Sequence, residues 1–77
     1  MPKATPEQLL AAAERELAII HKRLITLRIR LYRETGTYPD DLGAAIARVD
    51  FLQRDLLAGL ITPAEAKAAI DPVRQIQ

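Results

Sequence analysis

Seven apolar residues in the first half of the chain recur at alternating spacings of three and four. Such spacing puts all of them on one face of an α-helix, and three unbroken heptads are typical of a helix that packs lengthwise against other helices. At about 1.5 Å per residue, this helix would be roughly 40 Å long. The pattern therefore predicts an all-α fold built around one long helix. The residues of this seam are Leu10, Ala13, Leu17, Ile20, Leu24, Leu27 and Leu31.

Chain length limits what can stabilise such a fold. The 77 residues fit a single domain, expected over 1–77, and a chain of this size buries only about 60% of its unfolded surface. The chain has no cysteine and one histidine, His21, so neither disulfides nor a metal site is expected. Helix packing and oligomerisation remain as sources of stability.

Residues that favour helix ends mark both ends of the long helix, which is predicted over about 6–35. The segment Thr5-Pro6-Glu7-Gln8 combines a threonine N-cap, a proline at the first helical position and the glutamine of a capping box. Gly36 follows Thr35 and is a natural residue just beyond a helix C-terminus.

A second helix is predicted over about 41–58, and either Asp40 or Asp41 is suited to cap it. The short segment after Gly36 predicts that the first two helices form an antiparallel hairpin. The apolar seam of the second helix consists of Leu42, Ala45 or Ile46, Val49, Leu52 and Leu56.

A short third helix is predicted over about 63–70. Gly59 ends the second helix, and Thr62-Pro63-Ala64-Glu65 repeats the capping box of the N-terminus. Asp71-Pro72 is expected to stop the helix, because proline disfavours the helical conformation of the residue before it. Residues 1–4 and 73–77 are expected to be frayed.

The segment around Gly59 resembles a known family. Leu56-Leu57-Ala58-Gly59-Leu60-Ile61-Thr62, followed by Glu65, is similar to the helix-turn-helix core of SHOCT domains. The resemblance spans 52–70, about a quarter of the chain, and Ala66 stands where that family usually carries an aromatic residue. It implies a short helical hairpin with an oligomerisation or interaction role. Glycine, two apolar residues and a capping box would also join two unrelated helices.

The long helix carries more apolar surface than one hairpin can cover. Ile25, Ile29 and Tyr32 form a second stripe beside the seam, and His21 and Arg28 lie between the two stripes. Arg28 is expected either to extend its head to solvent or to pair with Asp50 or Asp55. Phe51 lies opposite the seam of the second helix. The pattern predicts self-association or docking on another helical protein, through Leu24, Ile25, Arg28, Ile29, Tyr32 and Phe51.

A basic stripe on the polar face of the long helix supports an alternative function. Its members suit contacts with phosphate, although no aromatic residues are interleaved for base stacking. A nucleic-acid-associated protein is therefore the second hypothesis. The stripe consists of Lys22, Arg23, Arg30 and Arg33.

Catalytic signatures are absent from the sequence. There is no Ser-His-Asp or Cys-His set, no glycine-rich phosphate loop and no HExxH-type spacing, so we predict no enzyme, no cofactor and no bound metal. Charged residues interrupt every apolar run, so neither a membrane span nor a signal peptide is expected. The prediction is a helical self-association or interaction module, a small structural or accessory subunit of a larger assembly such as a phage particle or bacterial complex. Its expected location is the cytoplasm, or the inside of a particle assembled there.

Overall fold

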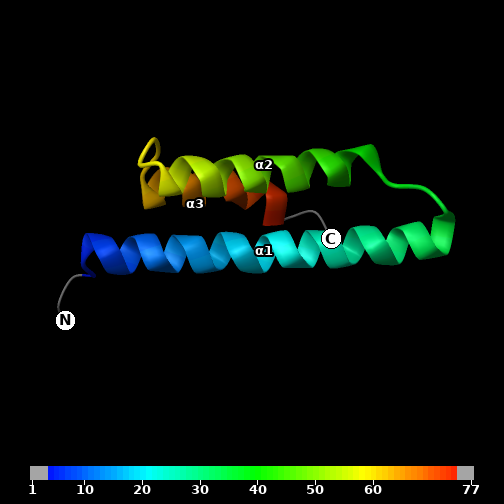
Figure 1. Cartoon of the computed structure of the whole chain (residues 1–77), viewed down its shortest axis with the longest axis horizontal. Helices are drawn as coiled ribbons and strands as arrows, with labels where there is room; N and C mark the ends of the chain where they lie inside the picture. The colour runs from blue at the N-terminus through cyan, green and yellow to red at the C-terminus, as the bar shows by residue number, and fades with distance from the viewer. Residues whose placement is uncertain (1–3, 75–77) are drawn as a thin grey trace.

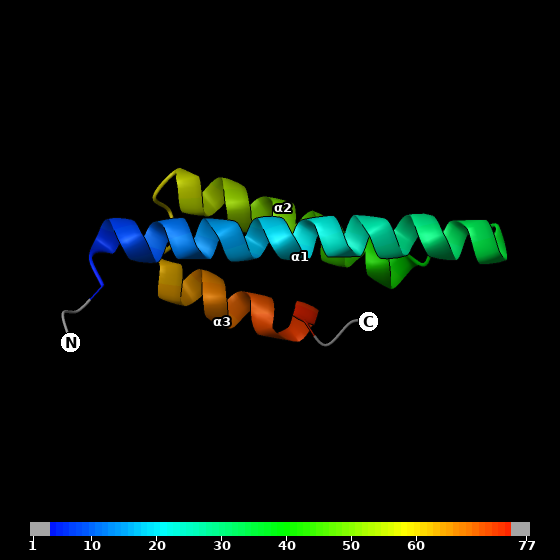
Figure 2. The ribbon, with the colours of Figure 1, turned by 90° about the horizontal axis from the view of Figure 1, so that it is seen from below.

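A computed structural model describes residues 4–74 and contains three helices. They are α1 (Pro6–Thr35), α2 (Asp40–Leu57) and α3 (Pro63–Arg74), and the described residues form no strand. The predicted all-α class is confirmed. In Figure 1 the chain turns back after α1, and α2 lies beside it. Figure 2 shows α3 along the N-terminal half of α1, on another side from α2.

Both predicted capping boxes are present. Thr5 Oγ1 accepts a hydrogen bond from the Gln8 amide at 3.2 Å, and Gln8 Oε1 accepts one from the Thr5 amide at 2.9 Å. The pair Thr62 and Glu65 makes the same two bonds at 3.1 and 3.0 Å. Each box satisfies two backbone N–H groups that the first turn of a helix leaves unpaired.

Glycines end α1 and α2 as predicted, because both adopt the left-handed backbone conformation. Gly36 has a φ of 77° and donates its N–H to the Tyr32 carbonyl at 2.7 Å. Gly59 has a φ of 76°. Around it the Gly59 N–H bonds to Leu56 O and the Leu60 N–H to Asp55 O, which is the Schellman pattern.

The start of α2 differs from the prediction that an aspartate caps it. The N-cap is Pro39, which makes no side-chain capping bond, and Asp40 and Asp41 lie inside the first turn. Carboxylates in this position still favour the helix, because they face the positive end of its dipole.

The end of α3 also differs from the prediction, since the helix continues through Pro72 to Arg74. Proline there removes only the hydrogen bond to the Ala68 carbonyl, close to the end of the helix. Continuing the helix buries Val73 beside Ile70 in the core, with 3% and 1% of their surfaces exposed. Val73 and Arg74 are thus helical, against the expectation for this tail. Residues 75–77 and 1–3 lie outside the described residues.

One core draws on all three helices. The predicted seams supply most of it, and α3 adds three residues that close it from a third side. Leu10, Ala13, Leu27, Leu31 and Leu52 of the seams are only partly buried and pack against its edge. The buried residues are Leu17, Ile20, Leu24, Leu42, Ala45, Ile46, Val49, Leu56, Ala66, Ile70 and Val73.

No helix within residues 4–74 combines the length and the apolar character that crossing a lipid bilayer demands.

Candidate interaction surfaces

The six residues predicted as an interface do not form one exposed surface. Leu24 is 3% exposed and belongs to the core of its own chain, so it is removed from the candidate interface. Ile25 is half-buried and packs against that core. Ile29, Tyr32 and Phe51 are exposed.

Tyr32 and Tyr38 form an aromatic patch near the turn between α1 and α2, and the exposed Ile29 precedes Tyr32 on α1. The rings of Tyr32 and Tyr38 stack with centroids 4.3 Å apart and an interplanar angle of 12°. One helical turn lies between Ile29 and Tyr32, so their side chains share a face of α1. The three residues keep between 44% and 56% of their surface exposed. Tyr38 was not among the predicted interface residues, because it follows the turn and belongs to no helical repeat.

Arg28 lies against the aromatic patch. Its guanidinium carbon is 5.5 Å from the Tyr38 ring centroid, within the range of a cation–π contact. Its Nε is buried and has no hydrogen-bond partner among the described residues. Neither expected acid pairs with it in that part of the chain, and Asp50 instead pairs with Arg54 at 3.2 Å.

Phe51 is an exposed aromatic residue on the outer face of α2. At about 100° per residue it lies roughly 200° around the helix from Val49, which is fully buried. Its side chain is 60% exposed, and Arg54 extends over the ring at 5.7 Å. This placement agrees with the predicted position of Phe51 opposite the seam.

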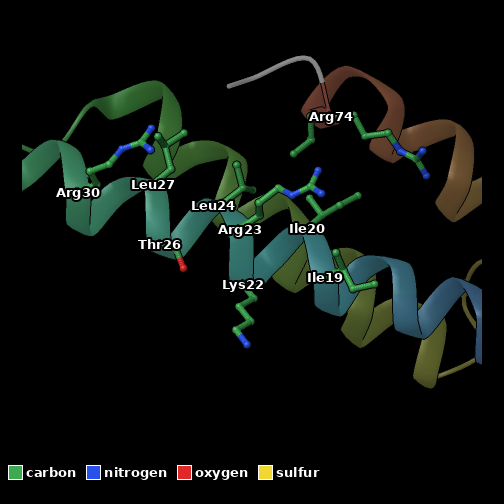
Figure 3. Close-up of a pocket in the computed structure, with 10 residues that line it drawn as sticks. Ile19, Ile20, Lys22, Arg23, Leu24, Thr26, Leu27, Arg30 and Arg74 are labelled. Carbon is green, nitrogen blue, oxygen red and sulfur yellow. The ribbon is translucent and has the colours of Figure 1, made fainter.

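A groove runs between α1 and the C-terminal end of α3, with a volume of about 620 Å³ (Figure 3). The apolar side chains of α1 on which α3 rests continue along α1 past the end of α3. This continuation forms the apolar lining of the groove. The charged residues Lys22, Arg23 and Arg30 lie on one side of this apolar lining. The residues that line it are Ile19, Ile20, Lys22, Arg23, Leu24, Thr26, Leu27, Arg30, Val73 and Arg74.

Every ionisable side chain that lines this groove is a cation. Arg74 is already paired with Glu16, and its Nε lies 3.8 Å from Asp71 Oδ1. Lys22, Arg23 and Arg30 have no ion pair within residues 4–74. Three of the four residues of the predicted basic stripe therefore line the groove, while Arg33 does not. Sequence reasoning missed the groove because Val73 and Arg74 were expected outside the helix.

No clustered metal ligands were found among the histidine, aspartate and glutamate residues of the described part. His21 is half-buried in α1, between the two predicted stripes.

Comparison with protein-family models, curated proteins and solved structures found no significant match to this chain. The resemblance of residues 52–70 to SHOCT domains therefore stays a prediction.

Proposed function

We propose that this chain is a non-enzymatic helical interaction module that associates with copies of itself. The observation that carries the proposal is the large apolar surface left outside the core. Single exposed apolar residues are ordinary, but adjacent ones mark interaction sites. Eight large apolar residues of the described part are each at least 44% exposed, and three of them, Ile29, Tyr32 and Tyr38, are adjacent. These residues are Leu9, Ile19, Ile29, Tyr32, Tyr38, Phe51, Leu57 and Leu60.

The proposed role is that of a small structural or accessory subunit. In this view α1 and α2 form an antiparallel hairpin, α3 covers one side, and the remaining apolar faces meet neighbouring subunits. Tyrosine, phenylalanine and arginine are enriched in protein interfaces, and Tyr32, Tyr38 and Phe51 are among the exposed apolar residues here. A bacterial complex or phage particle, assembled in the cytoplasm, would suit such a subunit.

Light scattering coupled to size-exclusion chromatography tests the proposal. The untagged chain, run at a series of micromolar concentrations, is expected to show a mass above that of the 8.6 kDa monomer that falls on dilution. Dilution matters because association follows mass action, whereas an elongated monomer elutes early at every concentration. A monomer mass throughout the series would contradict the proposal.

A nucleic-acid-associated function is the second candidate, favoured by the unpaired cations at the groove. Lys22, Arg23 and Arg30 lie on one side of α1 with no acid among the groove residues. If they contact phosphates, fluorescence anisotropy with labelled duplex and single-stranded DNA should show binding that weakens as salt rises. Replacing Arg23, Arg30 and Arg33 by glutamine should then reduce both the affinity and its salt dependence. Absence of binding at low salt would exclude this candidate.

A further inference from the structure

We propose that the groove between α1 and α3 binds an acidic amphipathic helix of a partner protein, which lies end to end with α3 along the C-terminal half of α1. Such a partner is a different chain, so this binding goes beyond self-association and can be tested separately from it. Three features support it: the place where α3 ends, the apolar lining of the groove, and the spacing of charged residues along α1.

The third helix covers only part of the α1 surface on which it packs. α1 has 30 residues and α3 has 12, so at about 1.5 Å per residue their lengths are roughly 45 Å and 18 Å. In Figure 2, α3 ends near the middle of α1, which continues past it. The groove that follows is lined by α1 and by the end of α3, without α2. The position of a third helix is therefore open along this part of α1.

The apolar lining of the groove has the spacing that a docked helix requires. The surface of α1 beside α3 accepts three apolar residues of α3 at spacings of four and three, and the α1 residues in the groove repeat the same spacings. Amphipathic helices dock in apolar grooves through residues spaced in this way. Leu27 is only half-buried and Ile19 at the edge is 52% exposed, so apolar surface remains to be covered. The α1 residues are Ile20, Leu24 and Leu27, and those of α3 are Ala66, Ile70 and Val73.

Charged residues recur at one heptad position on the α3 side of α1. Glu16, Arg23 and Arg30 are seven residues apart, so they lie on one line along the helix. Glu16 is paired with Arg74 of α3, which shows that this position reaches a helix packed beside α1. Arg23 and Arg30 lie one and two heptads further along and have no ion pair within residues 4–74. A helix in line with α3 would meet them with carboxylates where α3 has its arginine.

Neighbouring charges leave these two arginines available. Glu34 follows Arg30 by one helical turn, but it neither pairs with Arg30 nor lines the groove. Lys22 points away from α3 in Figure 3, so Arg23 is the cation nearer to the end of that helix. A guanidinium binds a carboxylate through two parallel hydrogen bonds, which makes glutamate or aspartate the matching residue on the partner.

The lining of the groove favours a protein helix over nucleic acid. A phosphate backbone would contact the arginines but would leave the apolar residues of the groove without a partner. The lining contains no aromatic residue on which a base could stack. An amphipathic helix with acidic residues at its edge uses both the apolar and the cationic part of the groove.

Fluorescence anisotropy with designed peptides tests the proposal. The probe is a labelled helical peptide of about 21 residues, with leucine at alternating spacings of three and four and glutamate at the flanking heptad positions. The full chain is expected to bind it. A scrambled peptide of the same composition, and a peptide with lysine in place of glutamate, should each bind at least about tenfold more weakly.

Exchanging the charges across the contact locates it. The Arg23→Glu/Arg30→Glu chain should bind the acidic peptide at least about tenfold more weakly and should bind the lysine peptide instead. Arg33→Glu/Arg48→Glu is the matched control, because it has the same net charge but neither residue lines the groove. It should bind the acidic peptide within about twofold of the unchanged chain. All four positions are exposed, so both variants should fold, which circular dichroism checks.

Several results would overturn the proposal. Absence of binding, or equal binding of the scrambled peptide, would exclude a site for an amphipathic helix. Equal losses in the two double variants would mean that overall charge attracts the peptide. DNA binding that requires Arg23 and Arg30, without peptide binding, would assign the groove to nucleic acid. Self-association lost only in the Arg23→Glu/Arg30→Glu chain would assign it to a second copy. A monomeric unchanged chain that binds the acidic peptide, by contrast, contradicts only the proposed self-association.

Discussion

At the scale of single residues, the contacts of Arg28 show what a helical repeat alone does not reveal. The repeat placed Arg28 between two apolar stripes, and its intermediate exposure fits that position. Its guanidinium lies over the ring of Tyr38, ten residues further along the chain and beyond the turn. Through these contacts with Tyr32 and Arg28, Tyr38 packs the turn against the C-terminal end of α1.

A double-mutant cycle should measure how much the contact between Tyr32 and Tyr38 stabilises the fold. Tyr32→Ala and Tyr38→Ala each remove one ring of the stack, and the double variant removes both. The coupling between them in the free energy of unfolding is expected to be about 0.5–1.5 kcal/mol, the value for paired aromatic rings. Urea unfolding at low protein concentration provides the measurement. Strictly additive losses would mean that the stack does not contribute to stability.

Aspartate substitutions at Leu24 and Ile19 compare a buried and an exposed position of α1. Leu24→Asp places a carboxylate in the core, and the cost of burying an unpaired charge should unfold the chain. Ile19→Asp changes a half-exposed position five residues earlier and is expected to cost less than about 1 kcal/mol. Circular dichroism during heating distinguishes them. A folded Leu24→Asp chain would show that the core is organised differently.

At the scale of helices, the sequence was informative where a signal lies within a few residues. Both capping boxes and both glycine ends involve bonds between residues at most five apart, so local chemistry determines them. The end of α3 depends instead on the burial of Val73 against α1, which outweighs the cost of Pro72. The sequence pattern contained the proline but not the packing that compensates for it.

The two capping boxes should contribute unequally to stability. Thr62→Ala removes the cap of a 12-residue helix that supplies Ala66, Ile70 and Val73 to the core, and we expect a loss of about 1–2 kcal/mol. Thr5→Ala removes the same chemical cap from α1, whose first turn is exposed and can unwind without disturbing the core. The expected loss there is about 0.5 kcal/mol or less. Chemical denaturation of both variants gives the comparison, and equal losses would contradict it.

At the scale of the whole molecule, stability comes from the apolar core and little of it from ion pairs. Among residues 4–74 no charged or polar residue is buried as a whole, although the Nε of Arg28 is. Their ion pairs join Arg54 to Asp50 and Arg74 to Glu16 and Asp71, with every partner at least 36% exposed. Exposed pairs of this kind contribute about 0–1 kcal/mol.

Salt should therefore affect folding and association differently. Raising sodium chloride from about 0.05 M to 0.5 M shortens the screening length severalfold. The free energy of unfolding is expected to change by less than about 1 kcal/mol, while any association that depends on the unpaired groove cations Lys22, Arg23 and Arg30 weakens. Urea unfolding and sedimentation in the same buffers measure the two effects. A large loss of folding stability in salt would assign the ion pairs a greater role.

The sequence also predicted the core better than the surfaces. Periodicity identified the residues of α1 and α2 that point inward, because burial follows the helical repeat. Which outward faces remain open depends on where α3 ends relative to α1, and no local pattern encodes that position. The groove, with Ile19 and Arg23 of α1 beside Val73 of α3, belongs to this second kind of feature.

The unequal lengths of α1 and α3 have a consequence for amide exchange. The buried residues of α1 all lie within 17–24, and its last eleven residues rest against α2 and the turn without a fully buried side chain. The free energy needed to open a segment follows the packing around it. Amide protons from Ile25 to Thr35 should therefore exchange with deuterium through local opening, while those of Leu17 to Leu24 exchange only when the whole chain unfolds.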